Sequence, residues 1–511
     1  MSAEAKRPNR DELKQLQQEK KDAEAKLRAD LEELESGTAS KPGLPNRTSS
    51  YSSVDEEQED RLDKITKQVA LMRDLLPVML RRLSQITDPR QPKKTKHTMA
   101  VLFIYGILMF VFQFFSRREV NREMTRPQFK ENLKLLFPDL EQLPHADTLF
   151  RLLRDLEKIE ELEETYLELL KHLIRKKKFQ RYLINGCYPI SIDGSQKFCS
   201  DTLWDENPLQ RTVGKTPKSP DGHQQYYVYV LEASLCFQNG MVIPFLSEFL
   251  EYGKGDSGCN KQDCELRAFK RLVERIREAF PRLRIILFLD GLYANRPVID
   301  ACRAHHLQYM IVLRDKCLST VWEEIDGLRH LGAEKRHWQQ WGNRRQDFWW
   351  FNSIRYETSQ NGKEYLTLHV VGCDETWKEV NAEAQTETKT GRHVWLSSCP
   401  LTTSIHHERC NLGARHRWGI EANFLVEKHQ GYSYEHRFSS NWQAMKGYHC
   451  LMKIAPCFNV LARFSEPLAK VFREMGVRPF LRFLRETCAG PWLNPLLVQQ
   501  RLQQHFQLRL E

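Results

Sequence analysis

"LRIILFLD", residues 283–290, is the stretch that decides the fold, because an unbroken apolar run ends there in a carboxylate. Such a run is typical of a strand that is buried on both faces of a parallel sheet. Residues 266–280 before it place apolar side chains at helical spacing and stop at Pro281. After it, residues 295–306 predict a helix and residues 307–315 another strand. This alternation predicts an α/β fold.

Three further strands are predicted upstream of this stretch. "YPISID", residues 188–193, also ends in a carboxylate, and residues 226–237 and 241–249 flank Asn239-Gly240, a hairpin signal. The resulting order, βββαβαβ, matches the start of an RNase H-like sheet, in which three antiparallel strands precede parallel ones. We therefore expect an α/β fold with an RNase H-like catalytic domain and a β-rich insertion, preceded by a helical N-terminal domain.

The domain boundaries follow from changes in composition and periodicity along the chain. Strand-like residues 345–357 and 364–373, with the turn "QNG" at 360–362, predict the insertion. The expected order is a charged helix (1–35), a flexible linker (36–60), a helical DNA-binding and dimerisation domain (61–180), the first part of the RNase H-like domain (181–320), the β-rich insertion (321–399), the second part of the catalytic domain (400–465) and a helical C-terminal region (466–511).

The composition restricts the class of protein. The chain has 511 residues, 41% of them hydrophobic, which excludes a disordered protein, and a formal charge of +10 favours a polyanionic partner, with nucleic acid ahead of a membrane surface. The 13 cysteines lack a framework spacing, and the N-terminus lacks an apolar signal segment. Both features indicate free thiols in a reducing cytosol.

Three N-terminal segments allow two interpretations each. Residues 99–115 are almost entirely apolar but short for a bilayer, which favours a buried helix over a spanning one. The apolar seam of residues 62–86 fits a coiled-coil dimer and an internal bundle helix equally, with a kink expected at Pro77. Arg151 and Arg154 lie on a helix that fits a helix-turn-helix motif or a plain amphipathic helix.

Charged residues suggest a site at the strand ends. Asp193 and Asp290 close the first and fourth strands of the predicted order, which are neighbours in an RNase H-like sheet. In "RHRWGIEANFLVEK", residues 415–428, the side chains of Arg417, Glu421 and Lys428 fall within about 40° on one helix face. A solvated ion-pair face is the plain explanation of that pattern. Alternatively, Glu421 completes a three-carboxylate site.

A three-carboxylate site suits phosphoryl chemistry. Hard divalent cations prefer oxygen ligands, and two metals about 4 Å apart activate the attacking oxygen and stabilise the leaving one. Arg417 and Lys428, which flank the acid, would neutralise phosphates near the scissile bond.

The same stretches resemble a known family. "SIDGSQ" (191–196), "LFLDGLYAN" (287–295) and "RHRWGIEANFLVEKHQGYSYEH" (415–436) are similar to the three catalytic stretches of DDE transposases of bacterial insertion sequences with an R-x3-E-x6-K signature. The resemblance covers residues 185–465. Related signatures often begin with a tyrosine three residues before the arginine, where this chain has Ala414.

The resemblance implies a transposase that binds the terminal repeats of a mobile element and catalyses DNA cleavage and strand transfer. Asp193, Asp290 and Glu421 would be the catalytic residues and ligands of Mg²⁺, with Mn²⁺ as a substitute, and Arg417 and Lys428 would bind DNA. The implied partners are the double-stranded element ends, target DNA and a second copy of the chain in the DNA complex, with no membrane and in the bacterial cytoplasm at the nucleoid. An RNase H-like nuclease without strand transfer and a catalytically decayed DNA-binding protein are the alternatives.

Two further clusters contain side chains with possible binding roles. Trp338, Trp341, Trp349 and Trp350 lie in the predicted insertion, where they would stack on an extruded base or fill a small β core. The second cluster contains soft metal-ligand types without a zinc-finger spacing, which argues against structural zinc; its members are Cys399, His406, His407 and Cys410.

Overall fold

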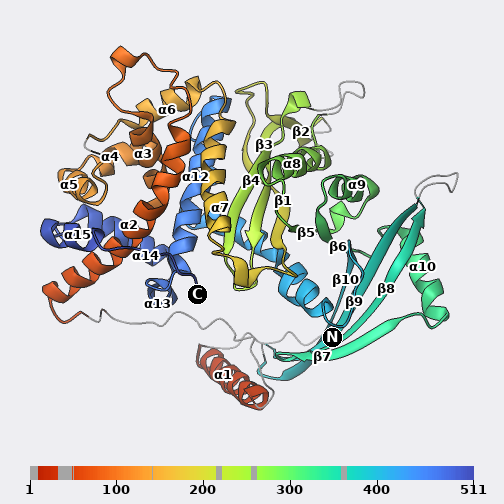
Figure 1. Ribbon diagram of the computed structural model, residues 1–511. Coiled ribbons are helices and arrows are strands. Elements are labelled where there is room, and N and C mark those ends of the chain that lie inside the picture. The colour runs from red at the N-terminus through yellow and green to blue at the C-terminus, as the bar shows by residue number, and fades with distance from the viewer. Residues whose placement is uncertain are drawn as a thin grey trace. The chain divides into compact units, whose positions relative to one another are not determined.

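The computed structural model describes residues 10–32, 49, 51–140, 142–214, 221–254, 262–357, 365–381 and 383–511 (Figure 1). The fold is mixed α/β, with N-terminal helices followed by strands of a large mixed sheet. The chain divides into two compact units, which we describe separately. Unit 1 comprises Met1–Gly43, Leu289–Ile299 and Gln308–Arg409, and unit 2 comprises Leu44–Phe288, Asp300–Leu307 and Cys410–Glu511.

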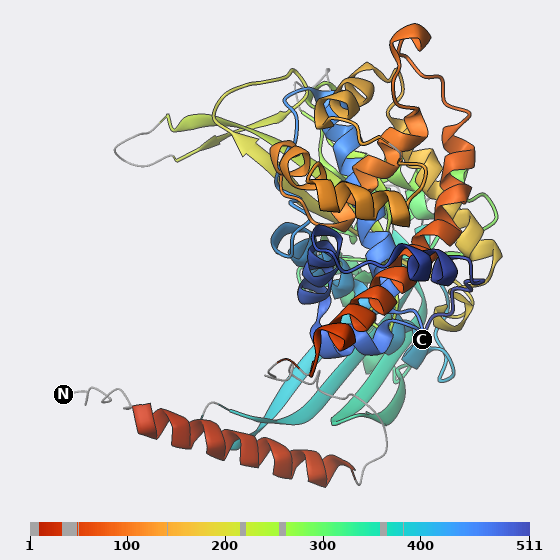
Figure 2. The ribbon, with the colours of Figure 1, turned by 90° about the vertical axis from the view of Figure 1, so that its left-hand side faces the viewer.

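The helices of unit 2 pack around one long buried helix, α12 (Trp442–Arg463), although it comes late in the chain (Figures 1 and 2). α12 packs against four N-terminal helices and against the sheet of the same unit. The N-terminal helices are α2 (Val54–Leu83), α3 (Met99–Val111), α4 (Arg117–Met124), α5 (Pro127–Leu136), α6 (Ala146–Asp155) and α7 (Glu160–Arg175). The C-terminal helices are α13 (Ala469–Met475), α14 (Val477–Ala489) and α15 (Pro495–Leu502).

Helix α2 corrects one predicted boundary. It begins at Val54, inside the range expected to be a linker, because Ser53 caps it by accepting a hydrogen bond from the Glu56 amide and because acids occupy its first turn. Residues 36–48 and 50 of that expected linker lie outside the described residues. The helix continues through Pro77, and the kink expected there stays a prediction.

The seam of α2 is buried inside a single chain. Helix α2 packs against α7 and α12, which belong to the same unit. The residues of the seam are Leu62, Ile65, Val69, Met72, Leu76, Met79, Leu83 and Ile86. The seam is therefore an internal bundle face. The interpretation as a coiled-coil dimer seam is wrong, because these apolar side chains already pack against helices of the same chain.

The apolar segment at residues 99–115 forms α3, a helix of 13 residues whose side chains are nearly all buried. Thr98 caps it by accepting from the Val101 amide. Across the described residues, we find no helix with the length and apolar character needed to cross a bilayer. The buried-helix prediction for this segment is confirmed.

The strands of unit 2 form a mixed sheet in the order β4-β3-β1-β5, with β2 also beside β3. β1 pairs antiparallel with β3 and parallel with β5, and β3 pairs antiparallel with β4 and β2. The strands are β1 (Tyr188–Ser200), β2 (Leu209–Val213), β3 (His223–Cys236), β4 (Val242–Phe249) and β5 (Ile285–Leu289). The predicted neighbouring of the first strand with the strand at 285–289 is confirmed, as is the turn at Gly240, whose φ is 81°. The short β2 was not predicted.

Helices cover both faces of this sheet. On one face, α8 (Glu265–Ala279) packs against β3 and β4. On the other, α11 (Gly419–His429) packs against β1 and β3, and its Ile420 and Phe424 contact Cys236. Successive residues of a strand point to opposite faces. Glu232 lies on the same face of β3 as Cys236, so its register partner Asp193, and Ser191 two residues earlier, lie on the face beneath α11.

The strands of unit 1 form an antiparallel meander in the order β6-β10-β9-β8-β7. These strands are β6 (Gln308–Val312), β7 (Lys335–Trp341), β8 (Arg344–Glu357), β9 (Tyr365–Val380) and β10 (Thr386–Ser397). The unit also holds α1 (Arg10–Glu32) and α10 (Ser319–His330), and α9 (Arg296–Ala304) crosses the boundary between units. β8 and β9 were predicted, whereas β7 and β10 were not, because β7 and the first half of β10 are largely polar and exposed. The turn predicted at 360–362 lies outside the described residues.

Candidate active site

Asp193 lies within β1 rather than at its end, because β1 continues to Ser200. The amide of Gly194 donates to its Oδ1 at 2.8 Å, and the side chain is 24% exposed. Burial raises the pKa of Asp193 to about 6; the Gly194 hydrogen bond opposes this shift and the charge of Glu421 adds to it. Because burial disfavours the ionised form of Asp193, a positive charge placed near its carboxyl group would stabilise that ionised form.

Arg417 joins Asp193 to Glu421. Its Nη1 lies 2.9 Å from Glu421 Oε1 and 4.0 Å from Asp193 Oδ2, and its side chain is buried. Arg417 belongs to a 3-10 turn, Ala414–Trp418, and Glu421 to the first turn of α11, so one continuous α-helix face was the wrong description of this pair. The structure nevertheless brings three predicted site residues together in unit 2, and a solvated surface pair does not describe a buried arginine.

Lys428 has a different environment. Its Nζ lies 3.3 Å from Glu435 Oε1 and 5.8 Å from the centre of the Tyr434 ring. It lies near the C-terminal end of α11, where a cation interacts favourably with the helix dipole.

Asp290 belongs to unit 1 and begins the turn Gly291–Tyr293 directly after β5. Its Oδ1 accepts from the Leu292 amide at 2.9 Å, and Arg314 Nη2 lies 3.4 Å from Oδ2. In the register of β1 and β5, Ser191 pairs with Phe288. Asp193 comes two residues after Ser191, and Asp290 comes two residues after Phe288. Among the described residues, no group of three or more His, Cys, Asp or Glu side chains is arranged to hold a metal.

The tryptophans and histidines of the other two predicted clusters lie in unit 1. Trp349 and Trp350 are buried, whereas Trp338 is 64% exposed. The ring of His406 stacks on Trp350 with centroids 5.8 Å apart, so this histidine packs as a core aromatic. The cysteines of the described segments are free thiols, as predicted.

Sequence reasoning missed a set of buried charges beneath α11. Glu232 and Lys453 are the clearest members, with exposed fractions of 0% and 4%. Each is a lone charge within an apolar run, in "YYVYVLEASLCF" and "HCLMKIAPCF". Such residues are almost never fully buried unless they are paired, and this signal was present in the sequence.

The comparisons with known proteins concern another part of the chain. Residues 80–170, from the end of α2 into α7, match a family model described as DDE_Tnp_1-associated. The match connects the chain with transposases through a domain that accompanies their catalytic part, and it does not reach the residues of the candidate active site. No curated protein matches the chain.

Proposed function

We propose that the protein is a DDE-type DNA transposase in which Asp193, Asp290 and Glu421 hold Mg²⁺ on an RNase H-like sheet. The observation that carries this proposal is the bridge from Arg417 to Asp193 and Glu421, residues that are 228 positions apart in the chain. The transposase-associated match at residues 80–170 supports it independently. The pairing order β4-β3-β1-β5 agrees with the RNase H-like arrangement that the proposal requires.

The donor set fits a hard divalent cation, since all three side chains offer carboxylate oxygens. Burial raises the pKa of Asp193 and the charge of Glu421 adds to this shift, so a bound cation would favour the ionised form of the carboxyl group. When bound, Mg²⁺ would activate the attacking oxygen and stabilise the leaving one. Asp193 and Glu421 both lie within ion-pair distance of Arg417 in unit 2, and Asp290, at the start of the turn after β5, would supply the third carboxylate.

The reaction has two steps at the same site. Water attacks a phosphodiester at the element end, the P–O3′ bond breaks, and the departing oxygen takes a proton to become a 3′-hydroxyl. That hydroxyl then attacks a target phosphodiester, forming one P–O bond and breaking another. Arg417 neutralises phosphate charge beside the carboxylates, and Lys428 does so farther along α11.

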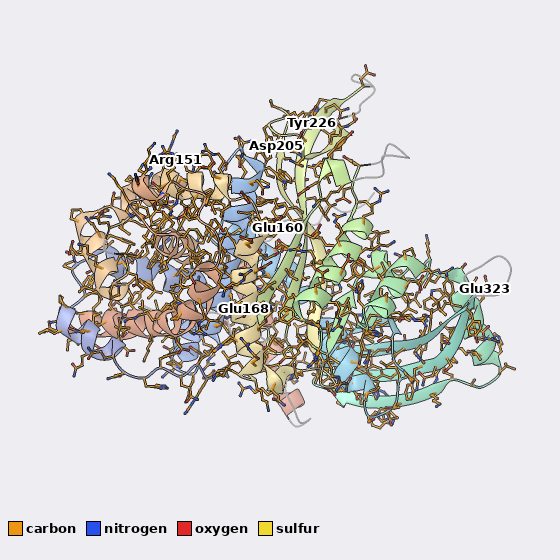
Figure 3. The ribbon with its side chains drawn as sticks, turned by 45° about the horizontal axis from the view of Figure 1, so that its top comes forward. Arg151, Glu160, Glu168, Asp205, Tyr226 and Glu323 are labelled. Carbon is orange, nitrogen blue, oxygen red and sulfur yellow. The ribbon has the colours of Figure 1, made fainter. Side chains whose placement is uncertain are left out.

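Exposed arginines on α4, at the start of α5 and on α6 are proposed to bind the element ends. They lie in the segment that matches the transposase-associated family. Arg151 projects from α6 at the periphery of unit 2 (Figure 3). The set comprises Arg118, Arg122, Arg126, Arg151 and Arg154. Cations of this kind supply sequence-independent affinity for phosphates.

The experiment uses DNA that carries the inverted repeats flanking the gene. Asp193→Asn, Asp290→Asn and Glu421→Gln should each abolish Mg²⁺-dependent nicking and leave end binding within about twofold, because carboxylates hold the metal and cations hold the DNA. Nicking by all three variants at the wild-type rate would contradict the assignment. A strand-transfer assay with pre-cleaved ends separates a transposase from a nuclease, which releases ends but does not join them.

A further inference from the structure

Five titratable side chains lie between α11 and the elements packed against it in unit 2, almost out of contact with solvent. Their exposed fractions do not exceed 4%. They are Lys197, Glu232, Glu427, His449 and Lys453. Burying a charge costs several kcal/mol unless it is paired and hydrogen-bonded, so each of these groups needs specific partners.

Lys453, on α12, connects two of the carboxylates. Its Nζ donates to both oxygens of Glu427, at 2.9 and 2.8 Å, and lies 3.5 Å from Glu232 Oε2. Burial lowers the pKa of Lys453, but the charges of Glu232 and Glu427 outweigh burial and raise it above its usual value. The lysine therefore stays charged between the two acids.

One of the two carboxylates lies on the strand next to Asp193, and the other lies on the helix that carries Glu421. Glu232 on β3 is the register partner of Asp193 on β1. Glu427 lies on α11, six residues after Glu421 and directly before Lys428. Lys453 therefore joins the strand beside Asp193 to the helix of Glu421.

Tyr434 strengthens the same connection. Its hydroxyl donates to Glu232 Oε1 at 3.2 Å, and its backbone amide donates to the Glu427 carbonyl at 3.1 Å. Lys197, on β1, donates to the Tyr434 carbonyl at 2.8 Å. Asn423 donates to Glu427 Oε1 at 2.9 Å, so this carboxylate is bonded within α11 as well.

We infer that Lys453 is a positioning residue, which fixes α11 against β3 through Glu427 and Glu232 so that Glu421 stays beside Asp193. The inference rests on the proposed function for its catalytic consequence, whereas the fixing of α11 does not depend on it. A purely stabilising role explains the cluster less well, because buried ion pairs often contribute no more stability than apolar residues of similar size. The cluster instead specifies one placement of α11.

Glu427→Gln is the first test, because it keeps the volume of the side chain and removes its charge. Hydrogen exchange of residues 419–429 should become faster, Mn²⁺ affinity should fall about tenfold, and kcat for nicking should fall with KM for DNA unchanged. The matched control is Glu248→Gln on the other face of the sheet, where Arg271 and Arg275 bind a carboxylate that is also buried. It should lower stability without changing exchange in α11.

Lys453→Ala allows a chemical rescue. Lys453 and His449 also line a pocket of about 450 Å³ in the same unit, which gives a small amine a route to the vacated space. Propylamine should restore the protection of α11 in Lys453→Ala but not in Lys453→Met, whose side chain fills that space without a charge. The inference would be overturned if propylamine restored the protection of α11 equally in both variants. It would also be overturned if propylamine restored neither variant and α11 exchange in Glu427→Gln equalled that of the wild type.

The outcomes separate this inference from the proposed function. If the wild type does not nick DNA but Glu427→Gln loosens α11, the transposase assignment fails and the positioning role stands. If the wild type nicks DNA and Glu427→Gln leaves both α11 exchange and Mn²⁺ affinity unchanged, the positioning role fails and the assignment stands.

Discussion

Asp193 is held in the folded chain at a cost that depends on pH. Its pKa rises from 3.8 to about 6, so the native state binds more protons than the unfolded state between these values. The contribution of this group to stability is therefore greatest below pH 4 and falls as the pH rises through 6. At pH 8 without divalent metal, the ionised carboxylate should destabilise the fold by about 1–3 kcal/mol.

Asp193→Asn tests this dependence. At pH 8 the variant should melt a few degrees above the wild type, because the amide carries no charge to bury, and the difference should shrink as the pH falls to 4. Thermal melts in the presence of EDTA at several pH values measure it. A difference that is constant with pH would show that the charge of Asp193 is not the cause.

At this scale, the sequence predicted part of the site. The spacing of Arg417 and Glu421, and the placement of Asp193 on a strand next to the one at 285–289, were enough to predict that these groups meet, although β1 continues beyond Asp193. The buried partners Glu232 and Lys453 were not predicted, because spacing along one element says nothing about which side chain of a distant helix arrives opposite it. Proximity of Asp290 to the other two acids stays a prediction.

Helix α2 gives a prediction at the scale of the element. Met72 is 1% exposed on the internal face, so Met72→Ala should lower the free energy of unfolding by about 2–5 kcal/mol without changing the mass of the particle. Urea unfolding and light scattering measure the two quantities. Arg73→Ala, one residue along on the exposed face, is the control. If Met72→Ala changed the mass of the particle without lowering the free energy of unfolding, the seam would be a contact between chains.

The sequence left two roles open for the tryptophans of β7 and β8, namely filling a β core and stacking on a base. Trp349 is buried, donates to Asp374 Oδ2 at 3.0 Å and lies where a Cβ on Gly372 would come within 2.0 Å of its ring. Trp338 is exposed beside Arg345, with the guanidinium 5.7 Å from its ring. The first fills the β core, and the second is available for stacking.

Matched alanine variants should therefore differ. Trp349→Ala should lower the free energy of unfolding by about 3–5 kcal/mol, and Trp338→Ala by less than about 0.5 kcal/mol. Trp338→Ala should weaken binding to DNA with unpaired bases by about 1–3 kcal/mol, measured by fluorescence anisotropy. Equal affinities of Trp338→Ala and the wild type for that DNA would exclude stacking by this residue.

At the scale of the whole molecule, the salt dependence of DNA binding tests whether the exposed arginines of α4 and α6 contact phosphates. Arg122→Ala with Arg151→Ala should reduce the slope of log K against log salt by about 1 for each phosphate that is no longer neutralised. Titrations at several salt concentrations measure the slope. Arg473→Ala, an exposed arginine on α13 that is paired with Glu511, is the control and should leave it unchanged. Equal slopes for the double variant and the wild type would place the DNA on another surface.

The alternation of strands and helices from residue 188 onward could be predicted, because buried parallel strands and amphipathic helices leave distinct periodicities. The pairing of β1 with β5 followed from that order. The polar strand β7 and the division of the chain into two units of discontinuous segments could not be predicted, because exposed strands lack a periodic apolar signal and contacts between distant segments leave no local pattern.

The late position of α12 in the chain has a consequence for biosynthesis. α12 begins at Trp442, 267 residues after α7 ends at Arg175. At about 5–20 residues per second, a ribosome needs roughly 15–50 s to reach it. Throughout that interval the apolar side chains of α3 have been made, but the helix that buries them has not. We therefore expect the nascent chain to depend on chaperones for most of its synthesis, and messages truncated before residue 442 to yield aggregates rather than a folded N-terminal fragment.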